Sequence, residues 1–254
     1  MGTPKAIILA GAPGAGKGYV LSGLDLGGLK VLNVDNAYID LLKKANVSLD
    51  LKNATPQGRS DAAKAMAQAN KEFKGKVAAT IEGKESFVLD GTAASIKQTA
   101  NLKNELEEAG YDVFMLYVYT DLERSLKQNE ARFEKSGGKD RSLAPAIVLR
   151  TWSDVTSNFK AYEAMFKDNF VSVANTLEDE KLSDVADIIK KYLDPFRPTG
   201  TKPKTDAQKA RSERSKAELN AKIKELLADD NVNMIINNSV SKEEAQAKIK
   251  QFLG

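Results

Sequence analysis

Short apolar segments alternate with longer amphipathic segments along most of the chain. The apolar segments are rich in β-branched and aromatic residues and show little polar alternation, so they predict strands that are covered by helices on both faces. The predicted strands span residues 6–10, 30–34, 86–89, 113–118 and 170–173.

The intervening segments have the spacing of amphipathic helices, with recognisable starts and stops. Thr120-Asp-Leu-Glu123 has the form of a capping box, Gly110 ends the preceding helix, and Pro145 suits a first turn. The predicted helices span residues 16–24, 37–44, 60–83, 96–109, 122–135, 146–167 and 182–193. This alternation predicts an α/β domain over residues 1–195, with three layers around a five-stranded parallel sheet.

The composition changes at Pro195, where Pro, Gly, Thr and Lys predominate, and we interpret residues 196–205 as a linker. Residues 206–254 are expected to form a helical tail, with a charged helix at 206–227 and a helix from the capping box at Ser241 to Leu253.

Two interpretations of the tail remain open: a helical hairpin for a protein partner, or a basic arm that contacts nucleic acid. Residues 197–254 carry 12 basic and 8 acidic side chains, which suffices for phosphate contacts. However, acids are interspersed and no aromatic residue lies between Phe196 and Phe252, so bases could not stack there. A solvated helix or a protein-interaction module is favoured.

The chain contains no cysteine and no histidine. Disulfides, thiolate nucleophiles and catalytic triads that use histidine are therefore excluded, and catalysis would depend on carboxylates, Lys, Arg, backbone amides and a hard metal. The net charge of +3 does not indicate nucleic-acid binding by the whole chain. Because no apolar stretch is long enough for a membrane span or a signal-peptide core, the expected location is the cytoplasm.

A glycine-rich segment, Gly11-Ala-Pro-Gly-Ala-Gly-Lys-Gly18, follows the first predicted strand and opens a helix. This is the context of a phosphate-binding loop, in which glycines let backbone amides approach phosphates and the lysine reaches the β- and γ-phosphates. We therefore expect ATP as the bound nucleotide. The expected nucleotide-binding residues are Gly11, Ala12, Pro13, Gly14, Ala15, Gly16, Lys17, Gly18 and Tyr19.

The motif departs from its usual form after Lys17, where a Ser or Thr hydroxyl normally binds Mg²⁺. Gly18 occupies that position and Tyr19 follows it. The run is similar to that of adenylate kinases, in which a glycine also follows the lysine but a threonine comes next. Mg²⁺ would then be held through water and acidic side chains, or the site binds nucleotide with little catalysis.

Two aspartates are expected at the carboxyl edge of the sheet, where parallel sheets bind their ligands. Asp35 follows the second strand and is a candidate base for an attacking hydroxyl, while Asp90 follows the third and is a candidate for holding a Mg²⁺-bound water. The alternatives are a helix N-cap for Asp35 and an Asp-Gly turn for Asp90.

Basic residues gather after the fourth strand, where Ser136-Gly-Gly indicates a flexible lid. A kinase needs such a lid to neutralise the transferring group and to exclude water. Arg132 and Arg141 are the candidates for this role, whereas Arg124 and Lys127 are expected on a solvated helix face.

These motifs, in this order, resemble the P-loop kinases grouped around polynucleotide 5′-kinases and zeta-type toxins. The resemblance covers residues 4–194 and rests on the phosphate loop, on Asp35 and on Asp90-Gly-Thr, with further matches at residues 107–113 and 129–132. It implies that Asp35 activates the acceptor hydroxyl, that Lys17 is the loop lysine, and that the lid arginines are Arg132 and Arg141.

The acceptor site would be lined by the segment after the second strand, with Tyr38 and Arg59 as candidate contacts; Arg59 suits an anionic oxygen, or lies free on the surface. By the same resemblance, Asn175 would approach the adenine.

The sequence thus predicts a kinase that uses ATP and Mg²⁺. Its acceptor would be a hydroxyl of a nucleic-acid end, a nucleotide or a nucleotide sugar. The alternative is a catalytically weak nucleotide-binding protein that acts in assembly through its tail.

Overall fold

The structure is a computed structural model that describes residues 2–24, 26, 28–51, 53–176, 187, 191, 205–228 and 230–254. The helix predicted at 182–193 and the linker predicted at 196–205 lie outside the described residues, apart from Asp187, Lys191 and Thr205.

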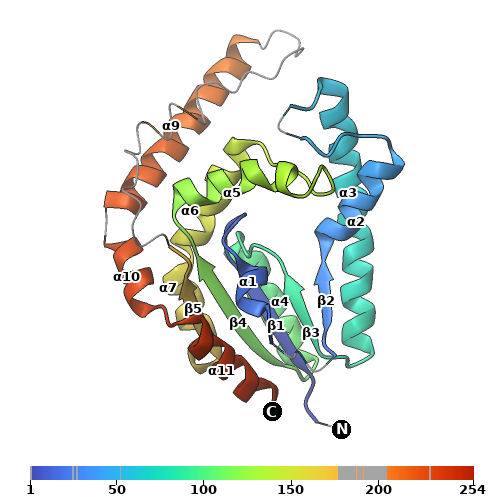
Figure 1. The fold of residues 1–254 in the computed structure, drawn as a ribbon, viewed down its shortest axis with the longest axis vertical. Helices are drawn as coiled ribbons and strands as arrows, with labels where there is room; N and C mark the ends of the chain where they lie inside the picture. Colours follow the sequence, from blue (N-terminus) through green and yellow to red (C-terminus); the bar gives the residue numbers. More distant parts are fainter. Residues whose placement is uncertain are drawn as a thin grey trace.

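Five parallel strands form one sheet in the order β2-β3-β1-β4-β5 (Figure 1). They are β1 (Lys5–Ala10), β2 (Lys30–Asn33), β3 (Phe87–Asp90), β4 (Asp112–Tyr119) and β5 (Phe170–Ala174). Each strand begins and ends within one residue of its predicted position. The predicted fold class, a three-layer α/β fold with a five-stranded parallel sheet and a helical C-terminal extension, is confirmed.

Seven helices precede the tail among the described residues. They are α1 (Lys17–Leu21), α2 (Val34–Lys44), α3 (Pro56–Glu82), α4 (Ile96–Glu108), α5 (Leu122–Lys135), α6 (Pro145–Ser157) and α7 (Phe159–Phe166). The helix predicted at 146–167 is therefore two helices. The break lies at Asn158, whose side-chain Nδ2 donates to the Ala94 carbonyl at 3.0 Å instead of facing solvent. A 3₁₀ turn at Lys167–Asn169 leads into β5.

One helix cap and the starts of two helices differ from the prediction. Helix α3 begins at Pro56, four residues before the predicted start, and Thr55 is its N-cap. The N-cap of α5 is Asp121, not Thr120, and no side chain caps it; the Thr120 hydroxyl instead donates to the Asn175 carbonyl at 3.1 Å. Helix α2 begins at Val34 and is capped by Asn33, whose Oδ1 accepts from the Asp35 amide at 2.6 Å. Asp35 is therefore neither a strand end nor an N-cap but a residue of the first helical turn.

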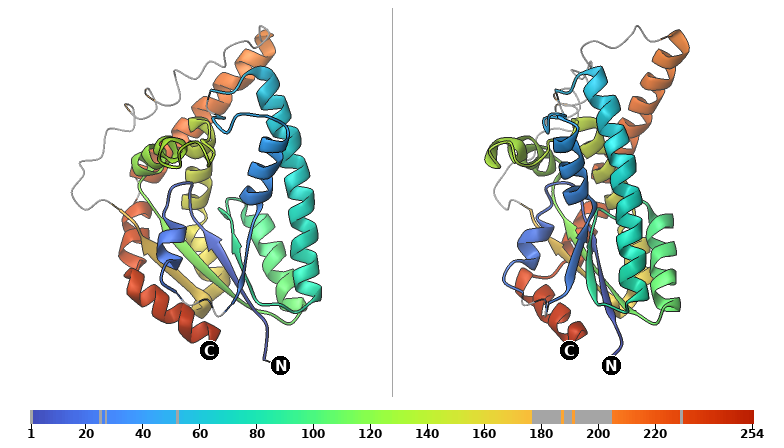
Figure 2. Two further views of the ribbon diagram at one scale, coloured as in Figure 1. Left: turned by 45° about the vertical axis from the view of Figure 1, so that its right-hand side comes forward. Right: turned by 90° about the vertical axis from the view of Figure 1, so that its right-hand side faces the viewer.

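The two faces of the sheet are buried in different ways. One face packs against α4, α6 and α7 around the fully buried Trp152, Phe159 and Tyr162. The opposite face packs against α1 and against the last helix of the chain. A smaller cluster joins α2 to α3 beside the sheet. The helices α5, α2 and α3 extend beyond the carboxyl ends of the strands (Figures 1 and 2).

The tail consists of α9 (Asp206–Ala228), α10 (Asn231–Asn238) and α11 (Lys242–Leu253), of which α10 was not predicted. Its apolar residues are buried against the rest of the chain: Ile223 and Ile235 lie in the cluster around Trp152, and Ile249 lies against the other sheet face. The capping box at Ser241 is confirmed. None of the helices within the described ranges is long and apolar enough to cross a membrane.

Candidate active site

The phosphate loop connects β1 to α1 and passes close to neighbouring backbone and side chains. At Gly11 (φ +152°) a Cβ would lie 2.6 Å from the Val118 carbonyl oxygen, and at Gly16 (φ +87°) it would lie 2.3 Å from Asn175 Nδ2. Any side chain would therefore collide at either position, in addition to the strain of the backbone angle. Close packing therefore favours glycine at these two positions of the motif.

Two side chains hold carbonyl groups of the loop from outside. Ser125 Oγ, on α5, donates to the Pro13 carbonyl at 2.6 Å. Asn175 Nδ2, directly after β5, donates to the Ala15 carbonyl at 2.9 Å.

These anchored carbonyls determine where the loop amides point. In a trans peptide the C=O and N–H groups point in opposite directions. The N–H groups of Gly14 and Gly16, which follow the anchored carbonyls, therefore point away from Ser125 and Asn175. Two backbone donors are thereby oriented for an anion.

Lys17 is half-buried at the start of α1, and its Nζ donates to the carbonyls of Gly11 at 3.1 Å and Ala12 at 3.3 Å. Burial lowers the pKa of Lys17 below 10.5; nearby Asp90 and Asp35 counteract this shift, and Arg132 reinforces it. The bonded partners of this amino group are carbonyl groups, so a phosphate that reaches Lys17 would not have to displace a carboxylate from its Nζ.

Asp35 and Arg141, which are 106 residues apart, form an ion pair with Oδ1 and Nη2 2.5 Å apart. The guanidinium also lies 5.3 Å from the centre of the Tyr38 ring. The Arg141 side chain is only 9% exposed, and its buried Nε has no hydrogen-bond partner among the described residues. Burial raises the pKa of Tyr38, Arg141 opposes this shift, and Asp35 adds to it.

The segment after α5, predicted as a lid, is docked in this structure. Arg132 Nε and Asp140 Oδ2 pair at 2.5 Å, and the other oxygen of Asp140 accepts from the Arg141 amide at 2.7 Å. Further along, Ser142 donates its amide to the Leu49 carbonyl at 3.1 Å. The lid arginines are thus connected to each other and to the loop between α2 and α3.

Asp90 ends β3, as predicted, and its Oδ2 accepts from Asn33 Nδ2 at 2.7 Å. No cluster of three or more potential metal-ligating side chains occurs among the described residues. Mg²⁺ is commonly held by one or two carboxylates together with phosphates and waters. A carboxylate oriented by Asn33 beside the phosphate loop fits that requirement.

Two predicted residues lie apart from the ion pairs. Arg59, in the first turns of α3, donates from Nη1 to the Ala54 carbonyl at 2.6 Å, and its Nη2 is buried without a partner among the described residues. Tyr19 is 62% exposed, and its ring lies 3.9 Å from Lys242 Nζ of α11. A side chain at position 18 would meet no atom within 4 Å, so packing does not account for Gly18.

Sequence reasoning missed several residues that build the site. Asn33 donates to the Asp90 carboxylate and caps the helix at the Asp35 amide, Ser125 holds the loop, and Asp140 pairs with a lid arginine. Arg124, expected on a solvated face, donates to the Asn175 carbonyl at 3.1 Å and so supports the loop anchor. Asn33 has a sequence signal, because an Asx residue before a helix is a common cap. The others depend on tertiary contacts.

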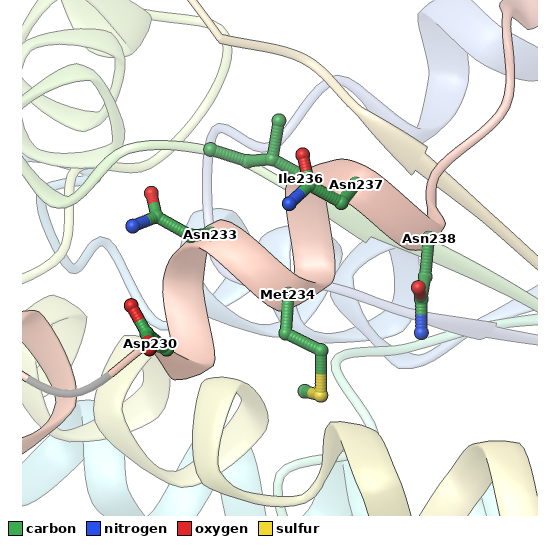
Figure 3. A pocket seen from close by; sticks show the side chains of 6 residues that line it. All are labelled: Asp230, Asn233, Met234, Ile236, Asn237 and Asn238. Atoms are coloured by element: carbon green, nitrogen blue, oxygen red, sulfur yellow. The ribbon is translucent and has the colours of Figure 1, made fainter.

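Two surface depressions lie outside the cluster formed by the phosphate loop and the ion pairs. A shallow depression of about 520 Å³ lies at α10, and its six lining residues all belong to Asp230 and that one helix. Figure 3 shows these side chains directed to different sides of the helix and not into a common enclosure. A second depression, of about 440 Å³, lies beside the lid and is lined by Asp50, Glu130 and Glu134 among others.

The zeta toxin family model matches residues 1–187. No curated protein matches the chain. Among solved structures, one from the PezAT toxin–antitoxin system of Streptococcus pneumoniae is 16% identical, with a TM-score of 0.50 over 90% of this chain and 88% of that chain. The AvrRxo1-ORF1:-ORF2 complex is 18% identical, with a TM-score of 0.54 over 96% and 79%. Its form with ATP is 17% identical, with a TM-score of 0.52 over 85% and 76%. At these low sequence identities, the TM-scores indicate a similar fold and nothing more.

Proposed function

The chain belongs to the zeta toxin family, and from this premise we propose that it is an ATP-dependent kinase that transfers the γ-phosphoryl group to a hydroxyl. The acceptor hydroxyl belongs to a nucleic-acid end, a nucleotide or a nucleotide sugar. The observation that carries the proposal is that Asp35, Asp90 and Arg132 lie close enough to Lys17 to affect its pKa, and that Arg141 is bonded to Asp35.

The nucleotide side would hold ATP through the loop amides and the Lys17 ammonium. The amides of Gly14 and Gly16 are already oriented, so phosphate binding requires little rearrangement of the loop. ATP as the nucleotide is supported by the AvrRxo1 structure that contains it. Tyr19 and Asn175 lie beside the loop and complete the proposed nucleotide side.

The acceptor side would use Asp35 as the base. The acceptor oxygen forms a bond to the γ-phosphorus while its proton passes to the Asp35 carboxylate, and the bond from the γ-phosphorus to the bridging oxygen breaks to leave ADP. The Arg141 guanidinium would leave Asp35 and bind the transferring phosphoryl group, and Arg132 would supply a second positive charge to that group. Tyr38, whose ring lies against the Arg141 guanidinium, would line this side, and Arg59 is the more distant candidate for contacting the acceptor.

Asp90 would hold Mg²⁺ through water, and the ion when bound would neutralise charge on the phosphates. Asn33 would keep the Asp90 carboxylate facing the loop, since it already donates to one of its oxygens.

The second candidate function is a weakly catalytic nucleotide-binding protein. It is favoured by Gly18, which supplies no hydroxyl for the metal, and by the exposed charged residues of α9, which suit a protein partner. The PezAT and AvrRxo1 relatives are named as toxin–antitoxin and two-component assemblies. In this case ATP would bind without transfer.

The deciding experiment is phosphoryl transfer from radiolabelled ATP with Mg²⁺ to a panel of 5′-hydroxyl oligonucleotides, nucleotides and nucleotide sugars. Loss of the base in Asp35→Asn is expected to reduce transfer by about 10²–10⁴-fold without weakening ATP binding. The matched control is Asp40→Asn, an exposed aspartate of the same helix. Wild type that binds ATP but labels no hydroxyl would favour the second candidate, and full activity in Asp35→Asn would refute the assigned base.

A further inference from the structure

The helix that carries Lys17 is too short to hold its own position. Helix α1 has five residues, Lys17–Leu21. A helix of this length is not stable in isolation, so its orientation is set by the groups that contact it. Because Lys17 is its first residue, any rotation of α1 displaces the ammonium from the phosphate loop.

The end of α1 opposite the loop is bonded to α11, from the far end of the chain. Gln246 Nε2 donates to the carbonyls of Val20 at 2.8 Å and Ser22 at 3.1 Å. These are carbonyls of the kind that a helix leaves unsatisfied at its C-terminus. One side chain thus completes the last turn of α1.

Lys242 makes a second connection between the same two helices. Its Nζ lies 3.9 Å from the centre of the Tyr19 ring and 3.3 Å from Ser22 Oγ. A cation at this end of α1 complements the negative end of the helix dipole, and its place over the aromatic ring fixes Tyr19. Lys242 and Gln246 are four residues apart and therefore share one face of α11.

Helix α11 is itself firmly attached to the sheet. Ala245 and Ile249 are fully buried in the cluster that includes Val20, and the Phe252 ring lies 5.0 Å from that of Phe114. The amide of Val240 bonds to the edge strand β5. Figure 2 shows α11 lying along the sheet beside α1. The family match ends at residue 187, so this attachment lies beyond the matched region.

We propose that α11 is a positioning element of the nucleotide site: Lys242 and Gln246 hold α1, and with it Lys17 and Tyr19, in the orientation that binds ATP. The proposal rests on the proposed function only in taking ATP as the ligand of the loop. It assigns the end of the tail a role inside the nucleotide site, distinct from any partner bound by α9.

The test is calorimetric titration of a nonhydrolysable ATP analogue with Lys242→Met, Gln246→Ala and the double variant. Gln246→Ala removes two hydrogen bonds, and Lys242→Met removes a hydrogen bond and a cation–π contact. Each single variant is expected to raise the Kd about threefold to tenfold, and the double variant further. In the transfer assay the KM for ATP should rise while kcat at saturating ATP stays within about twofold, because no reacting group has been removed.

Three further variants distinguish positioning from general weakening of the fold. Lys242→Arg retains a cation over the Tyr19 ring and should restore wild-type affinity. Lys248→Met and Gln251→Ala change exposed residues of the same helix and should leave the Kd unchanged. Melting temperatures are measured for every variant.

The outcomes separate the two proposals. Wild-type affinity in the Lys242→Met, Gln246→Ala double variant overturns the role of α11, as does equal weakening in the two controls. Lys17→Met is run in parallel: if it binds the analogue as wild type does, the nucleotide site itself is wrongly placed and the proposed function fails. If only Lys17→Met weakens binding, the proposed function stands and α11 plays no part.

Discussion

The charged side chains of the proposed nucleotide side and of the proposed acceptor side have different kinds of partners. On the nucleotide side, Lys17 is bonded to two carbonyls, and the loop is held by neutral groups of Ser125 and Asn175. On the acceptor side, Asp35 is paired with Arg141, and Arg132 is paired with Asp140. On one side the lysine is hydrogen-bonded to carbonyl groups, with Asp90 and Asp35 nearby, whereas on the other side each arginine is in direct contact with a carboxylate.

This difference indicates an order of events. An anion that reaches the loop can contact Lys17 Nζ without separating an ion pair, so nucleotide binding is favourable in the state described. A hydroxyl that reaches Asp35 meets a carboxylate of which one oxygen is paired with Arg141, and the charge of a bound triphosphate is suited to attract that guanidinium. We therefore expect ATP binding to precede and assist acceptor binding.

The largest effect is expected from Lys17→Met. Removing a half-buried cation that faces phosphate should weaken ATP binding by at least about 100-fold, the equivalent of about 3 kcal/mol. The affinity for the acceptor substrate should be little changed. Titration calorimetry with the ATP analogue measures the first effect, and an affinity unchanged from wild type would contradict the assignment.

The same variant should also be more stable than wild type, with a pH dependence of known sign. Burial lowers the pKa of Lys17 in the folded protein below 10.5. Between these two pKa values the unfolded chain binds more protons, so wild-type stability rises with pH in that interval. The melting temperature of Lys17→Met should therefore exceed that of wild type at neutral pH, and the gap should narrow towards pH 10.5. A gap that widens with rising pH would refute burial as the cause.

Arg141→Gln should affect only the acceptor side, with a smaller effect. Loss of one member of a mostly buried charge pair should reduce kcat/KM for the acceptor about 10-fold to 100-fold, while the Kd for ATP stays within about twofold. Arg150→Gln, a substitution of an exposed arginine on α6, is the matched control. Equal losses in ATP affinity and acceptor turnover would show that the two sides are not separable.

The sheet was predictable because each strand is a local run of apolar residues. The helices were less predictable. Asn158 lies at the break between α6 and α7, which were predicted as one helix, and its side chain bonds the Ala94 carbonyl, 64 residues away. The tail illustrates the same limit. The charged sequence of residues 206–227 predicts a solvated helix, yet Ile223, which has lysines on both sides, is fully buried against the domain.

Local sequence signals indicated which charged residues are candidates for the site, but they did not indicate how those residues pair. The glycine loop, Lys17 and Asp35 follow from motif and strand order. That Arg141 bonds Asp35, or that Gln246 bonds α1, depends on contacts across more than 100 residues. No periodic pattern contains that information.

The smallest effect tests how rigidly the nucleotide side is held. Asn175→Ala removes the bond to the Ala15 carbonyl, so the amide of Gly16 loses its fixed direction, and ATP affinity should fall about threefold to tenfold. Asn175→Asp should weaken binding more, because it also places a negative charge beside the phosphates. Asn237→Ala, on the exposed face of α10, should leave the Kd unchanged. If Asn175→Ala binds ATP as wild type does, the loop is preorganised by its glycines and Ser125 alone. The contrast between the two sides would then not depend on the Asn175 anchor.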